Sequence, residues 1–246
     1  MRTYLIVGDP GQSQDPFSIQ IYKAVPTFVP GAYQLGTSDR IIVKDDLVMQ
    51  YRIMNKKYRD VCKFIRDLMD RDDLKDNSMF VFDCTGIGRA VKEQFQEWGV
   101  KAITPISYTS GVKTNYVYLD SEDRRFNTGS GYSAFGFKTL DQINVPKSDL
   151  VEAARIALEQ NQVRVALSVP FRDEFNLQMR SFTGKMNPNG YTSYNNSDDD
   201  IHDDWVNCFM MRSWYRSNFH EQVISLESGD KSEEIADIGI YGGLRQ

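Results

Sequence analysis

The stretch Tyr4-Leu5-Ile6-Val7-Gly8-Asp9 decides how the rest of this sequence is interpreted. It is an apolar and aromatic run that ends in a carboxylate. Pro10 and Gly11 follow at once, so the run predicts a buried β-strand with an acid at its carboxyl end. An ionised carboxylate is costly to bury unless it has a partner such as a metal ion, an arginine or water. We therefore expect other parts of the chain to supply that partner.

Two later stretches bring further acids. Met79-Phe80-Val81-Phe82-Asp83 is a second apolar run that ends in aspartate, and His202-Asp203-Asp204-Trp205-Val206 opens a predicted helix with two more. The elements between them alternate in a way that predicts an α/β fold with a mixed central sheet of five strands or more, flanked by helices. In such a sheet the first and fourth strands can be parallel neighbours. We therefore expect Asp9 and Asp83 to lie side by side.

The remaining elements follow from hydrophobic periodicity and from turn residues. Strands are expected at residues 4–9, 17–22, 40–49, 79–83, 101–106 and 163–167. Helices are expected at residues 58–69, 88–98, 148–158, 171–182 and 203–216. The first three strands form an antiparallel meander with Pro26 in a loop, and Ser148 is a candidate helix cap. Residues 184–197 are expected to be a loop before the last helix.

Residues 1–224 are expected to form one domain, followed by an acidic, mobile tail at residues 225–246. Within the domain, residues 111–138 are rich in Gly, Ser, Tyr and Asn and predict an inserted β-hairpin or flexible loop. Basic residues on or just after this insertion are candidate contacts to DNA: Lys113, Arg124, Arg125, Lys138 and Lys147. A solvated surface loop is the alternative interpretation.

Composition narrows the kinds of site that the chain can build. Three scattered cysteines form no CxxC pair, which argues against a zinc site, and two histidines cannot build a histidine-rich one. The net charge is −5, of which the segment from Leu226 to Asp237 carries −4; the rest is −1, or +4 without five candidate metal-binding acids. That balance permits DNA binding. No apolar run is long enough to span a membrane and no signal peptide is evident, so we expect an intracellular protein without membrane contact.

A cluster of carboxylates suits Mg²⁺ or Mn²⁺, because these hard cations take oxygen ligands and keep positions open for water and phosphate. Two such ions about 3.5–4 Å apart can activate a water and stabilise the departing oxygen of a phosphodiester. Each acid also has a plainer interpretation. Asp9 could bind a backbone amide, Asp83 could belong to a weak nucleotide-binding turn, and Asp203 and Asp204 could cap a helix. The convergence of all three stretches on one end of a sheet favours the metal site.

Four motifs resemble the RNase H-like nuclease domain of viral large terminase subunits, the DNA-packaging enzymes of tailed bacteriophages and herpesviruses. They are Gly8-Asp9-Pro10-Gly11 with Asp15 beyond it, Phe82-Asp83-Cys84-Thr85-Gly86-Ile87-Gly88, Val145-Pro146-Lys147-Ser148-Asp149-Leu150, and His202-Asp203-Asp204. The resemblance covers the chain from the first strand to the last helix. It implies an RNase H-like (RuvC-like) fold with a β-hairpin insertion.

The resemblance also implies a two-metal endonuclease that cuts concatemeric viral DNA during genome packaging. Asp9, Asp83 and Asp203 would be catalytic metal ligands together with Asp204, and Asp15 a further ligand or supporting position. Neighbours on a helix point about 100° apart, so we expect Asp203 to be the closer ligand of its pair.

The implied partners are double-stranded DNA, a terminase ATPase domain, the small terminase subunit and the capsid portal, to which the tail would dock. The implied location is the host-cell cytoplasm, or the nucleus for a eukaryotic virus. The ATPase motor of a full large terminase is not in this sequence, so packaging is not expected of this chain alone.

Three alternatives remain at this stage. Asp9-Pro10-Gly11-Gln12-Ser13 also resembles the first phosphate loop of actin-like ATPases and sugar kinases, although those proteins need two such domains and this length holds one. A Holliday-junction resolvase of the same fold would differ in its preference for substrate structure. A non-catalytic DNA-binding or docking module would fail a metal-dependent nicking assay.

Overall fold

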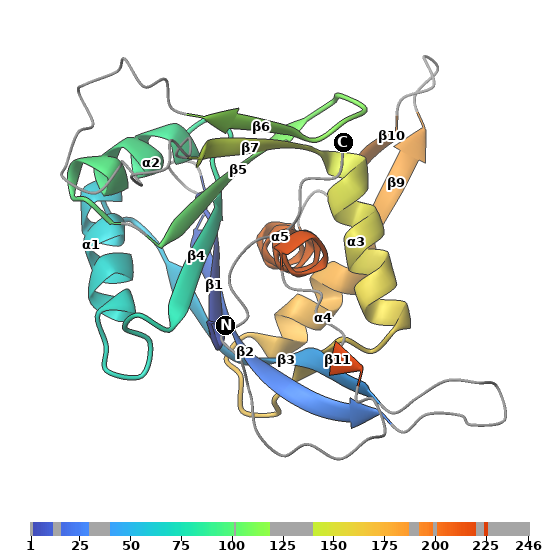
Figure 1. Cartoon of the computed structure of the whole chain (residues 1–246). Helices are drawn as coiled ribbons and strands as arrows, with labels where there is room; N and C mark the ends of the chain where they lie inside the picture. Colours follow the sequence, from blue (N-terminus) through green and yellow to red (C-terminus); the bar gives the residue numbers. More distant parts are fainter. Residues whose placement is uncertain are drawn as a thin grey trace, which may run out of the picture.

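A computed structural model describes residues 2–11, 16–29, 40–100, 102–118, 140–186, 192–198, 201–219 and 224–225. Its centre is a mixed sheet of nine strands with helices on both faces (Figure 1). The predicted α/β class and the mixed sheet of more than five strands are confirmed. Within the described residues, no helix is both long and apolar enough to cross a membrane.

The sheet begins with the predicted antiparallel meander. β1 (Tyr4–Asp9) pairs with β2 (Phe17–Val29), and β2 pairs with β3 (Arg40–Ile53). On its other side β1 pairs in parallel with β4 (Ser78–Asp83), which confirms the expected neighbours. Short connections explain the antiparallel half of the sheet, because only the later strands are joined through helices.

The parallel half continues outward from β4. β5 (Ile103–Thr109) and β7 (Leu140–Pro146) follow in parallel, and β6 (Asn115–Tyr118) closes that side antiparallel to β7. Two short strands, β8 (Val163–Val165) and β11 (Ile224–Ser225), pair with β3. Residues 111–138 were expected to form an inserted β-hairpin or flexible loop; the described part of this segment includes β6, which pairs into the main sheet, and residues 119–138 lie outside the described residues.

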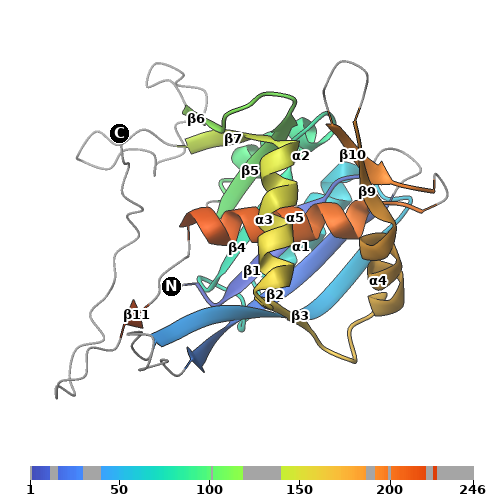
Figure 2. The ribbon, with the colours of Figure 1, turned by 90° about the vertical axis from the view of Figure 1, so that its right-hand side faces the viewer.

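Two layers of helices bury the two faces of the sheet. α1 (Tyr58–Met69) and α2 (Gly88–Glu97) pack on one face over a core that includes Ile6 and Phe80. α3 (Lys147–Glu159), α4 (Arg172–Ser181) and α5 (Asp204–Phe219) pack on the other face. α5 lies between the sheet and α3, which crosses over it (Figures 1 and 2).

Three sequence expectations were wrong in detail. β2 runs on through Pro26 because this part of β2 lies beyond the end of β1 and pairs only with β3, so the missing N–H breaks no ladder. The expected loop at residues 184–197 contains the antiparallel pair β9 (Phe182–Met186) and β10 (Thr192–Asn196). Most side chains of both strands are exposed, so their sequences lack the alternation of apolar and polar residues that predicts a strand. Ser148 is not a cap, since α3 already begins at Lys147, directly after Pro146.

A buried ion cluster fixes the middle and the carboxyl-terminal part of α5 to the sheet. Asp45 on β3 is fully buried and accepts hydrogen bonds from Arg212 Nε at 2.7 Å and from Arg216 Nε and Nη2 at 2.9 Å. Burial alone would raise the pKa of Asp45, but the two guanidinium groups hold that pKa below its usual value. The buried carboxylate of Asp45 therefore depends on the two arginines for compensation, and both arginines depend on that carboxylate.

Asp45→Asn should lower the free energy of unfolding by about 3–5 kcal/mol, because it leaves two buried guanidinium groups without their shared carboxylate. The matched control is Asp46→Asn on the next residue. Asp46 pairs with Arg164, whose side chain is 58% exposed, so its loss should cost only about 0–1 kcal/mol. Urea denaturation of the three proteins measures both values, and equal losses would contradict the structural role given to Asp45.

Candidate metal centre

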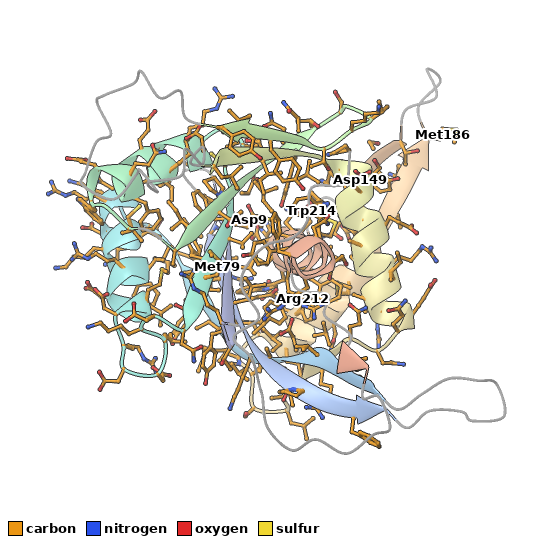
Figure 3. All side chains as sticks on the ribbon, viewed as in Figure 1. Asp9, Met79, Asp149, Met186, Arg212 and Trp214 are labelled. Carbon is orange, nitrogen blue, oxygen red and sulfur yellow. The ribbon has the colours of Figure 1, made fainter. Side chains whose placement is uncertain are left out.

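The carboxyl ends of β1 and β4 bring two of the predicted acids together. The strands pair in register up to Gly8 and Phe82, so Asp9 and Asp83 end adjacent strands at the same level. Two residues earlier on each strand the side chains belong to the core beneath α5. Because side chains alternate along a strand, both carboxylates project to the α5 face as well. Figure 3 shows Asp9 on that side of the sheet.

Asp9 is 6% exposed and has one direct hydrogen-bond donor among the described side chains. Asn207 Nδ2 on α5 donates to Asp9 Oδ2 at 2.9 Å. Burial raises the pKa of Asp9 well above its usual value, and the nearby carboxylates of Asp83 and Asp204 raise it further. The hydrogen bond from Asn207 acts in the opposite direction and does not offset these effects. An ionised Asp9 is therefore unfavourable without a cation.

Asp83 is held by the turn that follows β4. The backbone N–H of Thr85 donates to Asp83 Oδ1 at 2.7 Å. Burial raises the pKa of Asp83 to about 6, although hydrogen bonds from Thr85 and the positive charge of Lys147 act to lower it. Asp203 is a further group that raises this pKa. Asp83 therefore shares the electrostatic environment of the other predicted acids.

The glycines after Asp83 serve the shape of this turn. A Cβ atom at Gly88 would lie 2.0 Å from the carbonyl oxygen of Asp83, so only glycine allows α2 to begin against the strand end. Gly86 adopts a φ of +57°, which side chains other than glycine rarely tolerate. The Gly-Ile-Gly pattern thus has a structural cause, and it places Thr85 where its N–H reaches Asp83.

Asp203 and Asp204 enter the site at the start of α5. The preceding loop is anchored by Asn196, whose Nδ2 donates to the carbonyl oxygens of Ile201 and His202. The carbonyl oxygen of Asp203 accepts the N–H of Asn207 at 2.8 Å, and the helix proper begins at Asp204. The predicted pair of acids is therefore confirmed at a helix amino terminus, where negative charge is favourable.

The two aspartates of α5 differ in burial and in neighbours. Asp204 is buried, whereas the side chain of Asp203 is 29% exposed and its Oδ2 lies 3.9 Å from Lys147 Nζ. Asp204 raises the pKa of Asp9 more than Asp203 does, and Asp203 raises the pKa of Asp83. Asp203 therefore acts on both strand-end acids, whereas Asp204 acts mainly on Asp9. Which of them is the closer metal ligand stays a prediction.

We call Asp9, Asp83, Asp203 and Asp204 the acid cluster. Among the described residues, no three acidic, histidine or cysteine side chains form a ready-made ligand set. The donor chemistry nevertheless fits a hard divalent cation, because all four side chains offer carboxylate oxygens, and burial raises the pKa of Asp9 and Asp83, as do nearby carboxylates. Asn207 Oδ1 adds a buried oxygen without a hydrogen-bond partner next to the cluster.

The structure describes only two of the other predicted site residues, Lys113 and Lys147. Asp15, Arg124, Arg125 and Lys138 lie outside the described residues. Lys113 is exposed in the connection between β5 and β6. Lys147 begins α3 at the rim of the acid cluster, with its Nζ 5.8 Å from the centre of the Phe182 ring. Of the predicted basic residues, Lys147 alone is described next to the acids.

Sequence reasoning missed the part played by Asn207. Its Nδ2 donates to Asp9 at 2.9 Å and to Asp203 Oδ1 at 3.3 Å, so one amide links a strand-end acid to a helix acid. Its spacing could have predicted this role. Residues three and four apart lie on the same face of a helix, and Asn207 is three residues after Asp204 and four after Asp203. Its contact with Asp9 needed the tertiary fold, since 198 residues separate them.

Comparison with solved structures identifies the same fold in phage nucleases. The magnesium-bound large terminase nuclease from thermophilic phage G20c is 16% identical, with a TM-score of 0.50 over 85% of this chain and 79% of that chain. The nuclease domain of Thermus phage P74-26 large terminase is 16% identical, with a TM-score of 0.48 over 87% and 78% of the two chains. The manganese-bound g2p nuclease domain of bacteriophage SPP1 is 8% identical, with a TM-score of 0.46 over 87% and 86%.

The similarity lies in the fold rather than in the sequence. No protein-family model matches the chain, and no curated protein matches its sequence. The predicted fold, that of a large terminase nuclease domain, is confirmed. At 16% identity the similarity shows the architecture alone.

The raised pKa of Asp83 predicts a pH-dependent stability for the metal-free protein. The folded state binds this proton more tightly than the unfolded chain, whose aspartates titrate near 3.8, so stability is lost as the pH rises from about 4 to 6. Lowering the pH from 7 to 5 should therefore add about 1 kcal/mol from Asp83 alone. Asp45 acts in the opposite direction, but below pH 3.8, because its pKa is lowered.

Differential scanning calorimetry in EDTA at pH 7 and pH 5 measures this gain. Asp83→Asn should show a smaller gain than the unmodified protein and should be at least as stable at pH 7. An equal gain in both proteins would show that Asp83 has an ordinary pKa and that burial does not raise it.

Proposed function

We propose that this chain is a divalent-metal-dependent endonuclease that hydrolyses DNA phosphodiester bonds, and that it cuts concatemeric viral DNA during genome packaging. The observation that carries the proposal is the acid cluster: four carboxylates from β1, β4 and α5 lie near the carboxyl ends of two parallel strands, where burial, followed by repulsion from nearby carboxylates, raises the pKa of Asp9 and Asp83. A fold that assembles like charges in this way destabilises itself unless cations bind.

Asp9, Asp83, Asp203 and Asp204 would hold the ions, Mg²⁺ or Mn²⁺, and two of them are proposed. Bound there, the ions supply an activated water and stabilise the departing 3′ oxygen. The chain's own residues set the ligands in place. Thr85 holds one oxygen of Asp83, and Asn207 holds one oxygen each of Asp9 and Asp203.

Lys147 provides positive charge at the rim of the acid cluster. Its Nζ lies 3.9 Å from Asp203 Oδ2, and its side chain is 27% exposed. Once a cation compensates Asp203, Lys147 is free to pair with a phosphate of the bound strand. This role extends the sequence-based expectation that Lys147 contacts DNA, and it places that contact beside the scissile bond.

The proposed partners are double-stranded DNA and, by similarity to terminase nucleases, an ATPase domain, a small terminase subunit and a capsid portal. The similar solved structures come from phages, which favours the cytoplasm of the host cell as the place of action. The acid cluster acts on the phosphate backbone, which carries no base identity, so we expect little sequence preference.

Asp9→Asn and Asp83→Asn should each reduce plasmid nicking by more than roughly 100-fold, beyond the 10- to 100-fold typical of residues that only orient a metal ligand. Both variants should keep their circular dichroism spectrum and their stability in EDTA, because they remove repulsion. The control is Asp173→Asn, an aspartate that is 91% exposed in the first turn of α4, and it should nick normally.

The assay uses supercoiled plasmid with Mn²⁺, Mg²⁺ or EDTA. No nicking by the unmodified chain with either metal would favour a non-catalytic DNA-binding module, and cutting confined to four-way junctions would favour a resolvase. Nicking that persists in Asp83→Asn would place the chemistry outside the acid cluster.

DNA binding is proposed to use phosphate contacts from the inserted segment, including Arg124 and Arg125. Removing one phosphate-binding side chain should reduce the slope of log K against log salt concentration by about 0.9. Neutralising both residues to glutamine should therefore flatten the slope by roughly twice that amount. The matched control is Arg71→Gln with Lys75→Gln, which lie at the amino end of β4, away from the acid cluster. Equal slopes in both double variants would leave the insertion without a role in DNA binding.

A further inference from the structure

Tyr108 is an aromatic residue of β5 that reaches the acid cluster from the side opposite Asp9. β4 and β5 pair in parallel with Asp83 opposite Ile106, so Tyr108 lies two residues further along on the same face as Ile106. That face is the α5 face, because Ile106 belongs to the core beneath α5 and Tyr108 packs against the same core.

The turn that holds Asp83 also holds Tyr108. The backbone N–H of Tyr108 donates to Thr85 Oγ1 at 2.9 Å, and the backbone N–H of Thr85 donates to Asp83 Oδ1 at 2.7 Å. Thr85 therefore ties the end of β5 to the carboxylate at the end of β4. The backbone N–H of Thr85 therefore fixes Oδ1 of Asp83, and the Thr85 side chain also favours the ionised carboxylate.

The hydroxyl of Tyr108 is buried and has no hydrogen-bond partner among the described residues. Its surroundings are negative: burial first, and then the charges of Asp83 and Asp9, raise the pKa of Tyr108 well above its usual value. A phenylalanine would fill the same space without leaving a buried polar group unpaired, so stability alone does not account for a tyrosine here.

Tyr22 provides the contrast within the same core. Its hydroxyl is also buried but donates to Gln20 Oε1 at 2.5 Å. Tyr22 lies on β2 opposite Leu5, four residues before Asp9 on the paired strand. The hydroxyl of Tyr22 is therefore paired away from the acid cluster, whereas the buried hydroxyl of Tyr108 has no partner among the described residues.

We propose that Tyr108 is a positioning residue of the metal centre, whose hydroxyl donates a hydrogen bond to the second oxygen of Asp83 when that carboxylate is ionised and bound to a cation. The proposal rests on the proposed metal-dependent function. Hydrogen bonds to ionised carboxylates are the strong ones, and donors of this kind fix the orientation of metal ligands. Thr85 and Tyr108 would then hold the two oxygens of Asp83 from opposite sides.

Tyr108→Phe and Tyr22→Phe form a matched pair for the test. Calorimetric titration with Mn²⁺ should show affinity about 10- to 100-fold weaker in Tyr108→Phe, the usual loss when a donor to a metal ligand is removed, and unchanged affinity in Tyr22→Phe. Urea denaturation in EDTA should show the reverse: Tyr108→Phe keeps or raises the midpoint, and Tyr22→Phe lowers it.

Unchanged Mn²⁺ affinity in Tyr108→Phe, with normal binding by the unmodified protein, would overturn the role of Tyr108 and leave the proposed nuclease standing. A lowered midpoint for Tyr108→Phe in EDTA would also overturn it, because the hydroxyl would then be structural. Absence of Mn²⁺ binding by the unmodified protein would overturn this role and the proposed function together.

Discussion

The parallel pairing of β1 with β4 sets two carboxylates at the ends of adjacent strands, and the candidate site depends on this constraint. The register of this pairing fixes the positions of Asp9 and Asp83, because both strands end at the same level and both side chains project to the same face of the sheet. α5 then packs across that face with Asp203 and Asp204 at its amino terminus. The fold therefore concentrates negative charge where the strands end. The raised pKa values of Asp9 and Asp83 show that their ionised forms are unfavourable there.

That cost is offset farther along the same helix. α5 is buried from Asp204 to Arg216, and Arg212 and Arg216 bind the fully buried Asp45 on β3. This attachment fixes α5 against the sheet independently of the acid cluster. The two ends of one helix thus have opposite electrostatic characters: an ion cluster around Asp45 at one end holds the structure, and acids that repel one another gather at the other.

The strand-end acids and the paired aspartates could be predicted from the sequence, because apolar runs and a helix start are local patterns. Asp9 and Asp83 could be placed side by side because strand order limits topology. Contacts made only in the folded chain could not be predicted. Asn207 contacts Asp9 although 198 residues separate them. The position of Tyr108 near the acid cluster was missed because the strand that carries it was expected to end at residue 106. The hairpin of β9 and β10 was predicted as a loop, because strands exposed on both faces show no alternation.

The most direct test of the metal centre is a crystal structure grown with Mn²⁺ and measured at a wavelength where manganese scatters anomalously. The anomalous difference map should show two peaks about 3.5–4 Å apart between Asp9, Asp83 and the two aspartates of α5. An acid cluster without anomalous density at saturating Mn²⁺, or ions bound only elsewhere on the chain, would contradict the assignment of these four carboxylates as metal ligands.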